Sequence, residues 1–260
     1  MGFHADRYVA AVLLDAVVFD WGGTLTTSDL GRADLLDLWR LAAHHLDPAR
    51  EDELVEALAS IDARFWERTT TTFESWRLAE ILEAASVELG LDVTDAVIEE
   101  AATHHLDGWT THIRHEPEAG DVLRHLRQRG LRIGLLSNTN WPRTFHEHFL
   151  ERDGLTDLID VRRYTSDLGY VKPHASVFTE TLEALGVDDP SRAVFVGDRP
   201  YDDIHGARGV GMRTVLRTSP YVPDYDVEPD AAIDALAELP DLIDGWLTAT
   251  TEVQAAIDRS

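Results

Sequence analysis

Short apolar and β-branched runs recur along the chain, and each run ends at a polar or glycine-containing turn. Such runs are typical of buried strands in a parallel sheet, because helices cover both faces of these strands. We therefore predict six strands, the last of them a short edge strand, at 14–20, 131–136, 159–164, 193–198, 212–216 and 231–235.

More than a hundred residues separate the first two predicted strands, far more than a simple crossover needs. Apolar residues repeat there at helical spacing in four groups, which are Leu35, Leu38, Trp39 and Ala42; Leu54, Leu58 and Ile61; Leu78, Ile81 and Leu82; and Val97, Ala101 and Ala102. We expect this insertion to form a helical cap domain at 27–112, with a core domain comprising 1–26 and 113–260. The threonine run 69–72 is expected to form a loop or the start of a helix.

Strands that alternate with helices indicate the α/β class. The predicted fold is a Rossmann-like, doubly wound parallel sheet with an inserted α-helical cap. Apolar residues make up 44% of the 260-residue chain, enough for a sizeable core.

Acidic residues strongly outnumber basic ones, since 48 Asp and Glu stand against 23 Lys and Arg and leave a net charge of −25. A field of this sign repels nucleic acid and anionic lipid, so we expect neither as a partner. A small anionic substrate would need a local positive site. The acidic, lysine-poor composition suits either a high-salt cytoplasm or a GC-rich genome, and it predicts no particular oligomeric state.

Cysteine is absent, which excludes disulfides, thiolate nucleophiles and cysteine-based metal sites. Oxygen and imidazole ligands remain, so a hard cation such as Mg²⁺ is the expected metal. The apolar run 9–19 resembles part of a signal peptide, but Asp15 interrupts it and no cleavage pattern follows. We expect a soluble, cytoplasmic protein.

The chain contains 22 arginines but a single lysine, Lys172. An ammonium group is a compact point charge with three donors, whereas guanidinium is a planar fork. The one position that keeps lysine is therefore a functional candidate. It lies at Lys172-Pro173, just before a predicted helix.

Polar residues gather at the carboxyl ends of the predicted strands, where ligands bind in open α/β sheets. The first strand ends at Asp20 and runs into Trp21-Gly22-Gly23-Thr24, and the second runs into Ser137 and Asn138. The fourth ends at Asp198, with Asp202 and Asp203 shortly after it. Any one of these residues could merely cap a turn or a helix, but the set as a whole indicates one site.

This set can carry out phosphoryl transfer. An aspartate such as Asp20 can attack phosphorus when a divalent cation, held by Asp20 and Asp198, cancels the repulsion between the two anions. Ser137 and the backbone N–H groups of the glycine-containing turn can donate to phosphoryl oxygens, and Lys172 can neutralise the developing charge.

The order of these residues resembles the haloacid dehalogenase (HAD) superfamily, whose members are mostly phosphatases that form an aspartyl-phosphate. The resemblance spans nearly the whole chain and implies a Mg²⁺-dependent hydrolase of a small phosphorylated metabolite, with a helical cap inserted after the first motif. It implies these roles: Asp20, Ser137 and Lys172 as catalytic residues; Trp21, Gly23, Thr24 and Asn138 as substrate-binding residues; and Asp20, Gly22, Asp198 and Asp203 as metal ligands.

The chain departs from the family pattern at Gly22. Phosphatases of the family usually carry there an Asp that protonates the leaving alkoxide and then activates water. The glycine carbonyl can still act as a metal ligand, but the acid–base group is missing, and such a group typically contributes about 10²–10⁴ in rate. Alkyl phosphates are therefore expected to be poorer substrates than aryl or acyl phosphates.

The gap at Gly22 leaves other members of the superfamily to consider. A phosphonatase is excluded, because it needs a cap lysine and the only lysine is Lys172. A haloacid dehalogenase needs no acid, yet works without metal, which the acidic motif from Asp198 to Asp203 argues against. A weakened phosphate- and Mg²⁺-binding regulatory protein is a further alternative.

Other residues could reach the site, but a structural role is favoured for most of them. The cluster of His104, His105, His112 and His115 fits no metal template, and His174 and His205 are also expected to be structural. The cap tryptophans Trp39, Trp66, Trp76 and Trp109 are expected in the core. Arg68 and Arg77 could meet an anionic substrate.

Overall fold

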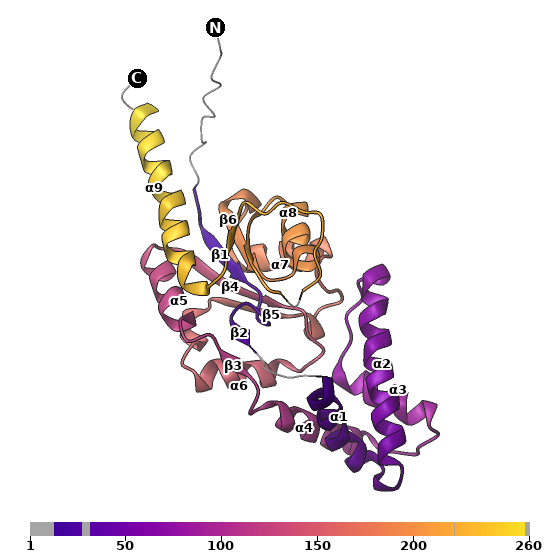
Figure 1. The fold of residues 1–260 in the computed structure, drawn as a ribbon. Coiled ribbons are helices and arrows are strands. Elements are labelled where there is room, and N and C mark those ends of the chain that lie inside the picture. The colour runs from indigo at the N-terminus through magenta and orange to yellow at the C-terminus, as the bar shows by residue number, and fades with distance from the viewer. Residues whose placement is uncertain (1–12, 28–31, 221, 258–260) are drawn as a thin grey trace.

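The computed structural model, which describes residues 13–27, 32–220 and 222–257, contains a six-stranded sheet in which every neighbouring pair of strands is parallel (Figure 1). Its strand order is β5-β4-β1-β6-β7-β8. All six predicted strands are confirmed, as β1 (Ala16–Phe19), β4 (Arg132–Ser137), β5 (Val161–Tyr164), β6 (Ala193–Gly197), β7 (Arg213–Arg217) and β8 (Ala231–Ile233).

Helices cover both faces of the sheet, as a doubly wound fold requires. Successive side chains of a strand point to opposite faces, so Val17 and Phe19 of β1 join one apolar cluster while Ala16 and Val18 join another. The first cluster packs under α5 (Ala119–Gln128), α6 (Arg143–Arg152) and α9 (Leu239–Ile257). The second packs under α7 (Ala175–Leu185) and α8 (Gly206–Gly209).

The long insertion folds as four helices, α1 (Arg32–Leu46), α2 (Glu51–Thr72), α3 (Leu78–Glu88) and α4 (Asp95–Trp109), which we call the helical insert. Figure 1 shows the insert beyond the sheet, on the side where β1 leads into β2. The short strands β2 (Thr26–Thr27) and β3 (Arg114–His115) pair antiparallel where the chain leaves and re-enters the core. The helical insertion is confirmed, while the division into domains at 27 and 112 stays a prediction.

The prediction for the threonine run 69–72 was wrong, because this run forms the last turn of α2. The Thr69 and Thr70 hydroxyls donate to backbone carbonyls three residues earlier, so their oxygens are satisfied within the helix. The helix ends at Phe73, whose φ of 57° is left-handed.

The segment after α2 ties the insert to the loop that carries Lys172. Val171 donates its backbone N–H to the Phe73 carbonyl at 2.8 Å, and Ser75 donates to Gly169 at 3.2 Å. The insert therefore contacts the core next to the predicted catalytic lysine.

Residues 9–12 of the apolar run near the N-terminus lie outside the described residues. Among the helices that the structure describes, none combines the length and the apolar character needed to cross a bilayer.

Candidate active site

The strand register brings the predicted site residues to one edge of the sheet. Phe19 of β1 lies beside Leu135 of β4 and Val196 of β6. Asp20 therefore leaves the sheet within one residue of Ser137 and Asp198. The connections from β1 lead to β4 on one side and, later, to β6 on the other, so this edge is the topological switch point where α/β proteins bind ligands.

Lys172 is almost fully buried, with 2% of its surface exposed, and its ammonium group joins two carboxylates. Nζ donates to Oδ1 of Asp20 and to Oδ1 of Asp203, each at 2.7 Å. Burial lowers the pKa of Lys172, but attraction to Asp20 and Asp203 outweighs that effect and raises the pKa above its ordinary value. The side chain is therefore a permanent positive charge at this edge.

Asn138 holds the backbone of the lysine loop. Its Oδ1 accepts the Lys172 N–H at 2.8 Å, and its Nδ2 donates to the Lys172 carbonyl at 3.1 Å. This amide therefore positions Lys172, although Asn138 also lines the cavity above Asp20. Its predicted contact with substrate stays a prediction.

Three buried carboxylates, those of Asp20, Asp198 and Asp203, face one another at the strand ends, with one oxygen of each within 4.8 Å of the others. Burial raises the pKa of Asp20 to about 6, despite the opposing effect of Lys172. Burial, Asp20 and Asp203 together raise the pKa of Asp198 to about 7. The negative charge of the cluster exceeds the single positive charge of Lys172, so the cluster attracts a further cation.

The donor set fits a hard divalent cation such as Mg²⁺. All the ligand atoms are carboxylate oxygens, and Oδ1 of Asp198 is buried with no hydrogen-bond partner. Asp203 has a second task, because its other oxygen accepts the Arg199 backbone N–H at 2.9 Å. Asp203 follows Asp198 through a π-helical turn, Pro200–His205, which turns its side chain back toward the strand end.

The turn after Asp20 brings its backbone close to Asp198. Gly23 has a φ of 75°, and a Cβ there would lie 2.3 Å from the Asp198 carboxylate, so only glycine fits. Gly22 is exposed and a Cβ there would meet nothing within 4 Å. Thr24, a predicted substrate-binding residue, is fully buried and is not among the residues that line the cavity.

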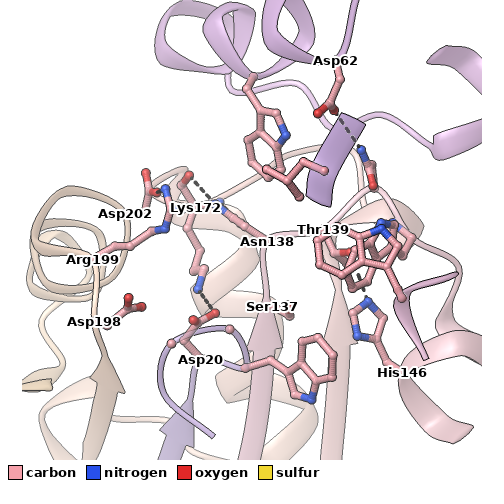
Figure 2. A pocket seen from close by; sticks show the side chains of 18 of the residues that line it. Asp20, Asp62, Ser137, Asn138, Thr139, His146, Lys172, Asp198, Arg199 and Asp202 are labelled. Atoms are coloured by element: carbon pink, nitrogen blue, oxygen red, sulfur yellow. Dashed lines mark hydrogen bonds and ion pairs between the residues drawn. The ribbon is translucent and has the colours of Figure 1, made fainter. Parts of the chain in front are cut away.

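A cavity of about 520 Å³ lies between the sheet edge and the helical insert (Figure 2). Its lining includes eight of the predicted site residues, namely Asp20, Trp21, Gly22, Gly23, Ser137, Asn138, Lys172 and Asp198. The insert contributes Leu35, Trp39, Asp62, Trp66, His105 and Trp109. A volume of this size suits a small metabolite.

The family model described as "Hydrolase: haloacid dehalogenase-like hydrolase" matches residues 14–211, which contain all these site residues. The chain belongs to this family. Its fold and its hydrolase class are therefore those expected from the order of the motifs.

Relatives of this HAD hydrolase include enzymes of two kinds. It is 30% identical to a phosphatase of Mycobacterium tuberculosis over 89% of this chain and 98% of the relative. It is 33% identical to glyceraldehyde 3-phosphate phosphatase of Pyrococcus furiosus over 52% of this chain, and the match spans about half of that relative, 55%. A 2-haloacid dehalogenase of Pseudomonas syringae superposes with a TM-score of 0.67 and 29% identity, covering 90% of this chain and 100% of that one.

Several site residues of the HAD hydrolase could not be assigned from the motifs. Trp39, Trp66 and Trp109 line the cavity. Trp39 and Trp76 are buried in the core as expected, whereas Trp66 and Trp109 are only partly buried. Asp62, Trp141 and His146 also line the cavity. Amphipathic helical spacing does not show which face of a helix meets the core, and Trp141 lies in the loop before α6, so the sequence pattern did not assign these residues to the site.

Of the histidines considered, His105 alone lines the cavity, where it stacks on Trp39 with ring centroids 4.0 Å apart. His174 caps α7, and His205 stacks on Tyr201 at 5.5 Å. Arg77 pairs with Glu80 at 3.4 Å, and Arg68 lies over the Phe65 ring, so neither arginine is part of the lining.

Proposed function

We propose that this HAD hydrolase is a Mg²⁺-dependent phosphatase that acts on a small phosphorylated metabolite through an aspartyl-phosphate on Asp20. The observation that carries the proposal is the pairing of Asp20 with Lys172 beside two further carboxylates at the mouth of a cavity. The phosphatase relatives support it.

Each group of this chain has a task in the proposed reaction. An oxygen of Asp20 attacks phosphorus as the bond from phosphorus to the alcohol oxygen breaks, and water then attacks the aspartyl-phosphate, which releases inorganic phosphate and restores Asp20. Lys172 holds the Asp20 carboxylate in place and balances negative charge on the phosphoryl group. Ser137, at the end of β4, donates to a phosphoryl oxygen. Asp203 keeps Lys172 oriented through its 2.7 Å contact.

The cation would be held by Asp20, Asp198 and Asp203, with the Gly22 carbonyl as the ligand that the family pattern implies. When bound, Mg²⁺ offsets the repulsion between carboxylate and phosphate. The buried, unpartnered Oδ1 of Asp198 supports this assignment.

In the proposed reaction the leaving oxygen has no carboxylic acid to protonate it, because Gly22 stands where the family pattern has an Asp. We expect phenyl and acyl phosphates, whose leaving groups need little protonation, to be hydrolysed about 10²-fold or more faster than simple alkyl phosphates. Release of inorganic phosphate from such a panel with Mg²⁺ tests the proposal. Binding without turnover of any compound would instead support the regulatory phosphate-binding alternative.

A second candidate function is dehalogenation, which the Pseudomonas syringae dehalogenase and the missing acid at Gly22 both favour. Halide needs no proton as it leaves, so Gly22 would be no handicap. Halide release from 2-chloropropionate that persists in EDTA, without phosphate release from the panel, would support it.

A further inference from the structure

The side of the cavity formed by the helical insert is lined by tryptophans. Trp39, Trp66 and Trp109 come from α1, α2 and α4, and Trp141 comes from the core loop after β4. We call these four residues the aromatic wall. The Trp109 and Trp141 ring centroids lie 4.8 Å apart, which makes this part of the wall continuous between insert and core.

One carboxylate, that of Asp62, lies against this wall. Figure 2 shows it entering the cavity from the insert, across from Asp20. It is one helical turn before Trp66 on α2, so the two side chains lie on the same face of the helix. Asn140 donates to the Asp62 carboxylate at 3.4 Å.

Asp62 is partly buried, yet no Lys, Arg or His among the described residues forms an ion pair with it. Burial raises its pKa to about 6, against the smaller opposing effect of Trp66, so the group is charged above that pH. A half-buried carboxylate beside apolar rings is costly unless a cation pairs with it. The other carboxylates of the lining already have cationic neighbours or belong to the metal cluster, since Asp202 faces Arg199 at 3.5 Å.

The chemistry of this surface selects among ligands. Tryptophan faces attract a cation within about 6 Å of the ring, and a carboxylate adds to that attraction. A second anionic group would be repelled, and a neutral apolar group would gain from burial alone. The phosphate end of a substrate is accounted for separately by Lys172 and the metal cluster.

We infer that Asp62 and the aromatic wall recognise a positively charged ammonium group, so that the substrate is a phosphate monoester whose alcohol carries an ammonium. The inference rests on the proposed phosphatase function. Such a compound has little net charge, which also removes the repulsion that a protein of net charge −25 would exert on a purely anionic substrate.

Two alkyl phosphates of the same shape test the inference. Phosphocholine carries a trimethylammonium group, and 3,3-dimethylbutyl phosphate carries a neutral tert-butyl group in its place. Affinities are measured by calorimetry with Mg²⁺ in an Asp20→Asn background, where catalysis does not interfere. We expect phosphocholine to bind about tenfold more tightly than the neutral compound, and Asp62→Asn to remove most of this preference.

Controls separate recognition from general damage. Glu56→Gln changes the same charge on the exposed face of α2 and should leave the tenfold preference intact. Trp66→Leu is a second variant in case Asp62→Asn does not fold, and it should also weaken the preference for phosphocholine. Equal affinities, no detectable binding of phosphocholine, or a preference that survives both variants would overturn the inference.

Failure of the proposed function would look different. In the chain with Asp20 intact, absence of phosphate release from phenyl phosphate and from both alkyl phosphates would contradict the phosphatase, while the affinity ratio would still decide the role of Asp62. A fall in turnover of both alkyl phosphates by the same factor in Asp62→Asn would also overturn the inference, because it would indicate proton transfer in place of charge recognition.

Discussion

In the proposed reaction, Gly22 determines which leaving groups are hydrolysed well. Its position is open, because a Cβ would meet nothing within 4 Å, and its φ is not left-handed. A carboxylate can therefore be added without strain in the turn between Asp20 and Gly23.

We expect Gly22→Asp to raise kcat/KM for alkyl phosphates by about 10²-fold, because it supplies the missing proton donor. The kcat/KM for phenyl phosphate should change much less, because kcat/KM reports transfer to Asp20 and not the later hydrolysis of the aspartyl-phosphate, which is common to both substrates. Steady-state kinetics on both substrates measure this, with Gly22→Ala as the control for loss of glycine. Equal gains on the two substrates would show that protonation of the leaving group is not what limits the rate.

His105 is held neutral inside the wall of the cavity. Its Nδ1 donates to the Leu38 carbonyl at 3.1 Å, and its Nε2 accepts from the Trp109 indole at 3.2 Å. Burial lowers its pKa to about 4, although the Leu38 hydrogen bond opposes the shift. The unfolded chain therefore binds a proton at His105 below about pH 6.5, while the folded chain does not.

The contribution of His105 to stability is thus present above pH 6.5 and is lost as the pH falls toward 4. We expect the difference in free energy of unfolding between the unmodified chain and His105→Gln to shrink by about 1.4 kcal/mol per pH unit across this window. Urea unfolding at several pH values measures it. A difference that stays constant with pH would mean that His105 is charged in the folded state.

At the scale of elements, the sheet and its helices could be predicted because their signals are local. Each strand is a short apolar run, and the order of these runs with helices between them specifies a parallel sheet. The position of Asp20, Ser137 and Asp198 at one edge of the sheet could be predicted as well, since parallel strands present their carboxyl ends together.

The wall of the site contributed by the insert could not be predicted in the same way. Helical spacing identified α1 to α4, but the orientation of each helix depends on packing against distant elements. Asp62 of α2 lies 3.4 Å from the Asn140 amide of the core, and the segment after α2 pairs with residues beside Lys172, contacts between parts of the chain that helical spacing does not reveal. Similarly, the Thr69–Thr72 run was assigned from its repetitive composition, which does not show that α2 continues through it to Thr72.

The turn between β1 and β2 is an element whose geometry the site requires. Gly23→Ala would place a Cβ against the Asp198 carboxylate at a left-handed backbone position. We expect this variant to lose phosphatase turnover and about 2–3 kcal/mol of stability. Denaturant unfolding and turnover are the measurements.

A matched control for Gly23 is Gly130→Ala, which has a φ of 80° with nothing within 4 Å of the added Cβ. Its free energy of unfolding should fall by only about 1–2 kcal/mol, as expected for an alanine in the left-handed region, and turnover should be unchanged. Equal losses in both variants would contradict a specific contact between Gly23 and Asp198.

At the scale of the whole molecule, the net charge of −25 sets the response to salt. The repulsion among 48 acidic residues is screened as the Debye length falls from about 10 Å at 0.1 M to about 3 Å at 1 M. Exposed ion pairs such as Arg40–Asp52 weaken as well, but each contributes little.

We therefore expect the melting temperature to rise between low salt and 1 M KCl. A thermal scan at several KCl concentrations measures it. A melting temperature that is unchanged or lower in molar KCl would argue against adaptation to a high-salt cytoplasm and leave a GC-rich genome as the explanation of the arginine-rich, lysine-poor composition.

In the proposed function, Asp20 is the nucleophile of a metal-dependent phosphatase. The most direct measurement is phosphate release from phenyl phosphate by the unmodified chain and by Asp20→Asn, each with Mg²⁺ and with EDTA, and with Glu56→Gln as the charge-matched control. We predict turnover only for the unmodified chain and the control with Mg²⁺, and a loss of about 10³-fold or more in Asp20→Asn. Turnover that persists in Asp20→Asn, or in EDTA, would contradict the claim.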